Sequence, residues 1–322
     1  MQHAARHDPG RGRILTPSGY WDVGPLRIRL RTDGTAPVRY SAPAYAGFFS
    51  PAAPRSGAAP LVALSMDVAL GKSSVPARPP FWRIGQSWAV WAEGADLLCL
   101  AGFHAPDSAF FGCRVARDLS RAELAVDPQL PGSVPGQIEA PLRYPLDQAV
   151  SWGLLSRIGG ALLHSAVAVR DGVGYVFAGR SGAGKSTLAG LCRAAGWRIL
   201  NDDRAMVFRR GGEWRVAGTP WHGSGRFAEA AEVPLGGIYL LRQARGNRLE
   251  PVANSQARLA LLDVAAVPWF EDSWAQGVLD GLNRLVGDID IRRFHFTKTP
   301  AAVQALTFCQ EDARPDARAG GA

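Results

Sequence analysis

Residues 179–187 read Gly-Arg-Ser-Gly-Ala-Gly-Lys-Ser-Thr and follow the apolar run Tyr-Val-Phe-Ala at 175–178. The stretch satisfies the pattern G-x-x-x-x-G-K-[ST] at every position, which is typical of a loop that binds nucleotide phosphates, or P-loop. Lysine is rare in this chain, so the expected number of chance matches is only on the order of 0.01. The sequence therefore predicts a binding site for a nucleoside triphosphate, ATP with Mg²⁺.

Each position of this loop has a physical role. Glycine lets the backbone turn so tightly that successive N–H groups point at phosphate oxygens, and the positive end of a helix that begins near Lys185 faces the same anion. Lys185 supplies a mobile positive charge for the β- and γ-phosphates, and the Ser186 hydroxyl is expected to ligate Mg²⁺. The residues expected to bind the nucleotide are Gly179, Ser181, Gly182, Ala183, Gly184, Lys185, Ser186 and Thr187.

The residues around the loop show strand and helix patterns. Apolar runs at 161–169 and 175–178 predict two strands. After the loop, apolar residues recur at helical spacing over 188–195, which predicts a helix that ends at Gly196, and a further strand is predicted at 197–200. Strand, loop, helix and strand make a βαβ-like unit, the context that a P-loop requires, so we predict an α/β P-loop domain.

The composition changes along the chain. Over residues 19–141, alternating or aromatic-rich runs separated by turn residues predict a β-rich N-terminal domain. Four prolines at 127–141 indicate a linker or an edge loop that leads into the second half, and we expect residues 142–312 to form a separately folding nucleotide-binding domain. Residues 1–18 and 313–322 lack apolar periodicity, and we expect flexible tails there.

Composition also argues against several classes of protein. The 322 residues, 47% of them hydrophobic, can bury a substantial core. No apolar stretch approaches the roughly 20 residues of a membrane span, and no secretory signal is evident. The net charge of +8 comes without basic runs interleaved with aromatics, so we expect neither a membrane nor nucleic acid as a partner. The cysteines form no CxxC pair, which favours a reducing compartment, the cytoplasm; they are Cys99, Cys113, Cys192 and Cys309.

Three further side chains lie at informative distances from the loop. Asp202 and Asp203 follow the strand after the predicted helix, at the carboxyl end where α/β proteins gather their ligands. His164 lies in the strand that precedes the loop. Each has an ordinary structural explanation when taken alone, because an Asp pair is common in turns and a strand histidine is more often a core residue.

Taken together, LLHSAVAV at 162–169 and YVFAGRSGAGKSTLAGLCRAAGWRILNDDRAMV at 175–207 resemble the catalytic core of the HPr kinase/phosphatase family and its relatives. The resemblance implies an α/β P-loop kinase domain of the HPr kinase/phosphoenolpyruvate carboxykinase type, preceded here by the smaller β-rich domain. It also implies ATP and Mg²⁺ as the nucleotide and metal.

The resemblance assigns a role to each of these side chains. Lys185 and Ser186 would bind the nucleotide and magnesium. Asp202 would take the proton from a serine hydroxyl, Asp203 would support the metal, and His164 would orient the catalytic carboxylate. An exchange of roles between the two aspartates stays open. Such a carboxylate agrees with general phosphoryl transfer, in which positioning and charge neutralisation dominate.

Farther along, Thr219-Pro220-Trp221-His222-Gly223 and VPLGGIYLLRQ at 233–243 resemble HPr-kinase-related proteins found beside modified-peptide genes, including lasso-peptide precursor kinases. We find no Glu-x-Arg-Gly substrate loop, so the resemblance to HPr kinase does not extend to HPr as substrate, and phosphorolysis stays open. In related kinases the region of Trp221, His222 and Arg226 faces the acceptor, which makes these residues candidates for the acceptor site. A surface turn with a packed tryptophan stays open as the alternative.

The sequence thus predicts an ATP-dependent kinase that phosphorylates a hydroxyl, expected to be a serine of a peptide or protein. A small hydroxylated molecule stays open as acceptor, as does a regulator that binds nucleotide without transfer. Binding alone would not need the set of His164, Asp202 and Asp203. The chain lacks the length and the metal-binding lysine and histidine set of phosphoenolpyruvate carboxykinase. The N-terminal domain is a candidate for recognising the acceptor or for assembly into a homo-oligomer.

Overall fold

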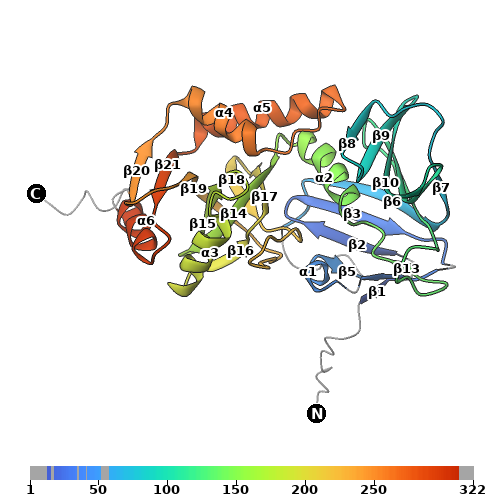
Figure 1. Ribbon diagram of the computed structural model, residues 1–322, viewed down its shortest axis with the longest axis horizontal. Helices are drawn as coiled ribbons and strands as arrows, with labels where there is room; N and C mark the ends of the chain where they lie inside the picture. Colours follow the sequence, from blue (N-terminus) through green and yellow to red (C-terminus); the bar gives the residue numbers. More distant parts are fainter. Residues whose placement is uncertain (1–12, 16–17, 35, 41, 52–57, 312–322) are drawn as a thin grey trace, which may run out of the picture. The chain divides into compact units, whose positions relative to one another are not determined.

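The computed structural model describes residues 13–15, 18–34, 36–40, 42–51 and 58–311. The chain divides into two compact units, each formed by two segments: unit 1 holds 1–154 and 268–275, and unit 2 holds 155–267 and 276–322. In Figure 1 the strands of unit 1 run from blue to green and those of unit 2 from yellow-green to red. Both sheets and helices are present, so the fold is mixed α/β.

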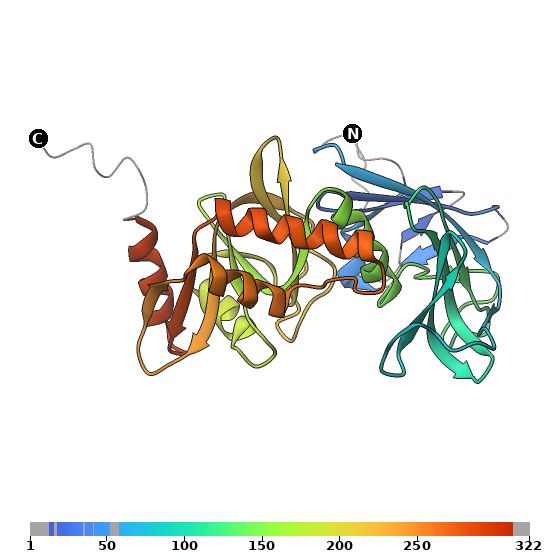
Figure 2. The same cartoon turned by 90° about the horizontal axis from the view of Figure 1, so that it is seen from above.

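Unit 1 is built mainly of strands (Figure 2), and most neighbouring pairs are antiparallel, with β6 pairing parallel to β3 and β12. Ten strands form one sheet in the order β5-β2-β3-β6-β12-β11-β10-β9-β8, with β7 paired to β11, and three form another in the order β1-β4-β13. The strands are β1 (Arg13–Leu15), β2 (Ser18–Val23), β3 (Leu26–Arg31), β4 (Val38–Tyr40), β5 (Phe49–Ser50), β6 (Val62–Leu70), β7 (Ser73–Ser74), β8 (Trp82–Ile84), β9 (Trp88–Glu93), β10 (Asp96–Ala105), β11 (Ser108–Ala116), β12 (Ala122–Val126) and β13 (Ile138–Glu139). The helices are α1 (Pro43–Ala46) and the first part of α2 (Leu146–Arg157).

Alternating burial explains why these segments are strands. In β6, Leu64, Met66 and Val68 are buried while the residues between them are exposed, because successive side chains of a strand point to opposite faces of the sheet. The sheet carries a cavity of about 830 Å³ that Lys72 helps to line. Lys72 lies with Gly71 between β6 and β7 and is exposed.

The division of the chain differs from the one that the sequence suggested. Residues 142–154 and 268–275 belong to unit 1, because Trp152 and Phe270 pack against Trp88 with ring centroids 5.8 and 5.9 Å apart. The proline-containing stretch at 127–141 buries apolar residues and supplies the edge strand β13, which agrees with the alternative of an edge loop and not with a free linker. Of the expected N-terminal tail, residues 13–15 form β1. Residues 1–12, 16–17 and 313–322 lie outside the described residues.

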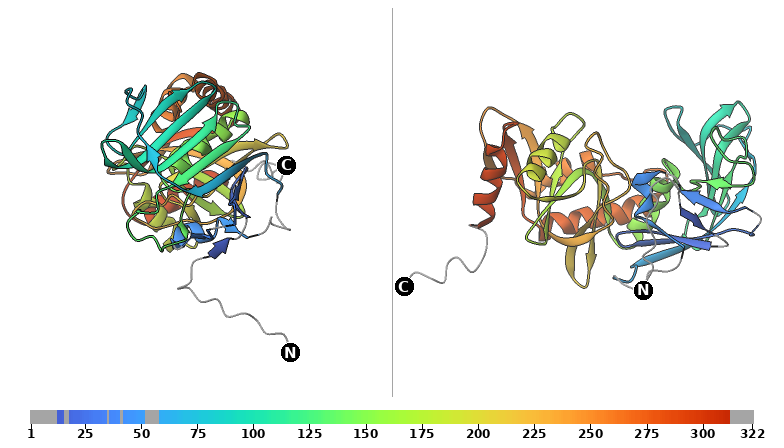
Figure 3. Two further views of the ribbon diagram at one scale, coloured as in Figure 1. Left: turned by 90° about the vertical axis from the view of Figure 1, so that its right-hand side faces the viewer. Right: turned by 90° about the horizontal axis from the view of Figure 1, so that it is seen from below.

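In the described residues, unit 2 combines a sheet with helices α3 to α6 and the end of α2 (Figure 3). The sheet has eight strands in the order β15-β14-β17-β18-β19-β21-β20, with β16 paired to β14 and β15 also paired to β19. The strands are β14 (Ala161–Arg170), β15 (Val173–Ala178), β16 (Arg198–Asn201), β17 (Arg204–Arg210), β18 (Glu213–Ala217), β19 (Glu232–Gln243), β20 (Arg248–Pro251) and β21 (Ile291–Phe296). The helices are α3 (Lys185–Ala194), α4 (Asn254–Val264), α5 (Asp272–Asp288), whose first turn belongs to unit 1, and α6 (Ala301–Glu311).

Strand β14 organises the part of unit 2 that carries the candidate site. It pairs antiparallel with β15 and with β16, so these two strands are parallel to each other and flank β14, and α3 connects them. Helix α3 buries Leu188, Ala189 and Cys192 in a cluster that also contains Val303 and Leu306 of α6. The predicted order of strand, loop, helix and strand is therefore present, with β14 lying between the two strands.

None of the helices in the described ranges has the length and apolar character needed to span a bilayer.

Candidate active site

The glycine-rich loop (residues 179–184) connects the end of β15 to the start of α3. Gly184 has φ = 99°, in the left-handed region, and a Cβ atom there would lie 2.7 Å from the Phe296 ring. A Cβ atom on Gly179 would lie 2.7 Å from that of Ala183. Since real Cβ atoms do not approach other atoms so closely, the loop closes in this form only with glycine at both positions.

The start of α3 has the properties of an anion site. Gly184 precedes the helix and no side chain caps it, so the first N–H groups of α3 have no side-chain acceptor and the positive end of the helix dipole faces the loop. Gln243 of β19 donates a hydrogen bond from Nε2 to the Gly182 carbonyl, 2.7 Å away, and fastens the loop. Ser181 is exposed and Ser186 half-buried. The loop and the start of α3 could therefore hold a phosphate group, and the Ser186 hydroxyl could ligate a metal ion.

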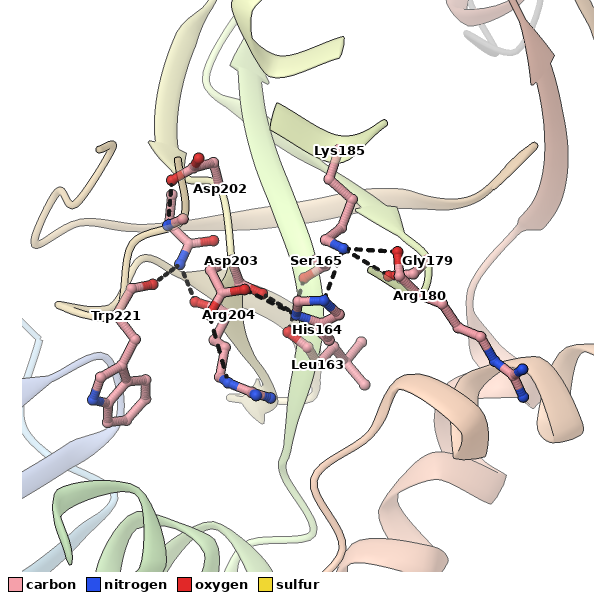
Figure 4. A network of polar contacts seen from close by, with 12 residues as sticks. Leu163, His164, Ser165, Gly179, Arg180, Lys185, Asp202, Asp203, Arg204 and Trp221 are labelled. Carbon is pink, nitrogen blue, oxygen red and sulfur yellow. Dashed lines mark hydrogen bonds and ion pairs between the residues drawn. The ribbon is translucent and has the colours of Figure 1, made fainter. Parts of the chain in front are cut away.

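Lys185 turns its ammonium group back toward the loop and toward β14 (Figure 4). Its Nζ donates to the carbonyls of Gly179 and Arg180, at 2.8 and 3.1 Å, and lies 2.9 Å from Nε2 of His164. Burial lowers the pKa of Lys185, against the opposing effect of the Asp203 charge. An ammonium can only donate, so Nε2 of His164 accepts and the other ring nitrogen carries the proton.

His164 contacts Asp203 through its other ring nitrogen. Its Nδ1 lies 3.0 Å from the Asp203 carboxylate and 3.0 Å from the Asp203 carbonyl. Nε of Arg204 lies 3.7 Å from the other carboxylate oxygen. Burial raises the pKa of Asp203, but the hydrogen bond from His164 and the charges of Arg204, His164 and Lys185 together hold this pKa below its usual value. Asp203 is therefore an ionised, partly exposed carboxylate at neutral pH.

Asp202 has a different environment from its neighbour. Its residue is only 1% exposed, and its carboxylate accepts three backbone hydrogen bonds: from Gly223 at 2.8 Å, from Gly225 at 2.6 Å and from Phe227 at 3.3 Å. Both oxygens are thus used within the protein, as buried carboxylates require. The structure brings His164 to Asp203 and not to Asp202, whereas the resemblance pairs the histidine with the catalytic carboxylate and assigns that role to Asp202.

The three candidates for acceptor binding lie at different depths. Trp221 is buried, and its carbonyl accepts a hydrogen bond from Asn201, at 3.2 Å, which agrees with the alternative of a packed tryptophan. His222 and Arg226 are exposed on the segment that surrounds Asp202. Nδ1 of His222 lies 3.0 Å from the Gly223 carbonyl. Only the last two side chains are accessible to a ligand.

Some contacts of the site are not evident in the sequence. One is the hydrogen bond from Gln243 to the loop. Another is a bidentate ion pair between Arg180 of the loop and Asp263 of α4. No local pattern indicates either partner, because both contacts depend on how distant elements pack. Within the described ranges no three His, Cys, Asp or Glu side chains converge on a metal site. Mg²⁺ uses few protein oxygens when nucleotide phosphates and water complete its shell, so this does not conflict with a magnesium nucleotide.

Comparison with known proteins gives limited similarity. The model of a family described as SynChlorMet cassette protein ScmC matches residues 150–283, which include the glycine-rich loop, His164 and both aspartates. No curated protein matches the chain. Among solved structures, the chain is similar to the Hpr(Ser) kinase/phosphatase from Coxiella burnetii, with a TM-score of 0.27 and 12% identity, over 47% of this chain and 95% of that one. A structural similarity this distant carries no argument about function.

Proposed function

We propose that this protein is an ATP-dependent phosphotransferase that moves the γ-phosphate of Mg-ATP to a hydroxyl group, with the serine of a peptide or protein as acceptor. The observation that carries the proposal is the unbroken series of contacts from Lys185 through His164 to the Asp203 carboxylate. It connects the candidate phosphate site to a group that can accept a proton. Nucleotide binding without transfer would not need that group.

The glycine-rich loop and the first turn of α3 would hold the nucleotide. Backbone N–H groups would bind phosphate oxygens, and Lys185 would exchange its carbonyl partners for the β- and γ-phosphates. The Ser186 hydroxyl would ligate Mg²⁺, with phosphate oxygens and water completing the metal's shell. The metal neutralises the charge that develops on the phosphates during transfer.

Asp203 would act on the acceptor. As the hydroxyl oxygen bonds to the γ-phosphorus, its proton moves to the Asp203 carboxylate, and the bond from phosphorus to the bridging oxygen breaks with its electron pair leaving on ADP. Because the pKa of Asp203 is low, proton transfer is favourable only once the hydroxyl oxygen has largely bonded to phosphorus. His164 would keep the carboxylate in place and ionised.

This proposal moves the role of the base from Asp202, where the resemblance places it, to Asp203. Asp202 would have a structural role, since its carboxylate accepts hydrogen bonds from three backbone N–H groups of the loop at 222–227. Asp203 would be the base, since His164 orients it and it is partly exposed. A regulator that only binds nucleotide is the competing function.

The direct test is to incubate the protein with γ-labelled ATP, Mg²⁺ and a library of short serine-containing peptides, and to identify labelled products by mass spectrometry. We expect label on serine, and none with Lys185→Ala. Nucleotide binding by the parent without transfer to any peptide would support the regulator and contradict the proposal.

A further inference from the structure

The loop at residues 222–227, which we call the Asp202-anchored loop, is held at three points by one buried carboxylate. Gly223 and Gly225 allow this close approach, since a Cβ atom at either position would lie 3.0 or 2.7 Å from a carboxylate oxygen of Asp202. The loop therefore has a fixed backbone. Its anchor is the chain neighbour of Asp203, the proposed base.

Arg226 stands out within this loop because of its backbone. Its φ is 56°, in the left-handed region, where a side chain costs conformational energy and glycine does not. Strained residues of this kind cluster where a structure needs a particular side chain. The loop has glycine at 223 and 225, where contact with Asp202 leaves no room for a side chain. At position 226, where glycine would relieve the strained φ, the loop has arginine instead.

The guanidinium of Arg226 is exposed and available. Within the described part of the chain it has no hydrogen bond or ion pair, whereas neighbouring arginines are engaged. Arg193 stacks on the Phe227 ring at 5.3 Å, Arg204 lies 3.7 Å from Asp203, and Arg198 pairs with Glu229. The loop sequence His-Gly-Ser-Gly-Arg-Phe contains no acidic residue. Within the described residues, the loop thus presents one guanidinium without a side-chain partner, on a backbone that Asp202 holds in place.

We propose that Arg226 binds a carboxylate on the acceptor, so that the preferred acceptor is a serine flanked by acidic residues in a peptide. The planar guanidinium can bind a carboxylate through two parallel hydrogen bonds, which fixes orientation as well as charge. The inference rests on the proposed function. Nucleotide phosphates have their own donors in the glycine-rich loop and α3, while Arg226 belongs to the loop that holds the residue next to the base.

The test uses short synthetic peptides with one serine flanked by Asp and Glu, by Lys and Arg, or by Ala, together with Mg-ATP and the full-length protein. We expect the parent to favour the acidic peptide in kcat/KM by about 10- to 100-fold, the range expected for a charge-assisted hydrogen bond. Arg226→Ala should remove the preference and leave the KM for ATP unchanged. Arg226→Glu should shift the preference toward the basic peptide.

Arg226→Gly is the matched control for a structural role, because it removes the side chain and relieves the strained φ together. It should lose the acidic preference with a thermal midpoint no lower than the parent's. Equal transfer to all three peptides by the parent would overturn this inference and leave the proposed function intact. A raised KM for ATP in Arg226→Ala with the acidic preference kept would overturn it in favour of a nucleotide contact. No transfer to any peptide would contradict the proposed function as well.

Discussion

Lys185 is the residue on which nucleotide binding depends most directly. Replacing it with Ala removes the mobile positive charge, and we expect the affinity for Mg-ATP to fall at least about tenfold, since hydrogen bonds to charged groups contribute about 1.5–3 kcal/mol. Titration calorimetry measures this. Lys72→Ala is the control, because Lys72 lies between β6 and β7 of unit 1 and outside the glycine-rich loop. Equal affinities for the parent and both variants would contradict the phosphate site.

The two aspartates show where sequence reasoning reaches its limit. Their position after a strand and near the loop follows from local patterns, but adjacent residues point in different directions, and only tertiary contacts decide which one turns inward. Asp202 accepts hydrogen bonds from backbone N–H groups of a loop that lies 21 to 25 positions farther along the chain. Asp203 meets a histidine 39 positions away. No local signal distinguishes the two.

The lowered pKa of Asp203 predicts a dependence of stability on pH. A carboxylate whose folded-state pKa lies below its unfolded value of about 3.9 stabilises the fold above that pH, and the contribution is lost as the pH falls through the folded pKa. Asp203→Asn should therefore cost stability at pH 7, by an amount that shrinks in acid below about pH 4. Urea denaturation of the parent and of Asp203→Asn, at pH 7 and at a pH below about 4, measures the difference in stability. A difference that stays constant over this range would show that the ionised carboxylate is not the source.

At the scale of the element, α3 was predictable from sequence because its signals are local. Apolar spacing, the preceding glycines and Gly196 at its end all belong to one stretch of chain, and Gly196 adopts φ = 87° as its position beyond the helix predicts. The supports from β19 and β21 were not predictable, since Gln243 and Phe296 approach the loop only after the sheet has formed.

Gly184→Ala should damage the element that holds the nucleotide. The new methyl group would meet Phe296 and the backbone would stay at φ = 99°, so we expect loss of measurable Mg-ATP binding together with a lower thermal midpoint. Gly190→Ala is the control within the same helix: nothing lies within 4 Å of its Cβ position. It should keep the affinity and gain about 0.5–1 kcal/mol of stability. Similar behaviour of the two variants would contradict the described loop.

At the scale of the whole molecule, the β-rich character of the first part followed from alternating patterns, but the composition of the units did not. Residues 268–275 return to unit 1 because Phe270 and Trp274 join an aromatic cluster with Trp88 and Trp152. Aromatic residues in the sequence do not reveal which distant partners they meet.

This packing modifies the expectation of a separately folding C-terminal domain. A fragment of residues 142–312 keeps Phe270 and Trp274 but lacks Trp88, so it should expose apolar surface. We expect it to aggregate or to bind a hydrophobic dye, with a thermal midpoint several degrees below that of the full chain. Light scattering and thermal denaturation check this. A monomeric fragment as stable as the full protein would contradict the assignment of residues 268–275 to unit 1.

The measurement that tests the central claim most directly is single-turnover phosphoryl transfer by Asp203→Asn and Asp202→Asn, beside the parent, with Mg-ATP affinity measured for each. We use the best peptide acceptor of the parent. Asp203→Asn keeps the size of the side chain and removes the base, so it should bind Mg-ATP within a few-fold of the parent and transfer phosphate about 10²–10⁴ times more slowly. Asp202→Asn should instead lower the thermal midpoint, because it disturbs the loop at 222–227. Transfer by Asp203→Asn at the parental rate would contradict the proposed catalytic role of Asp203.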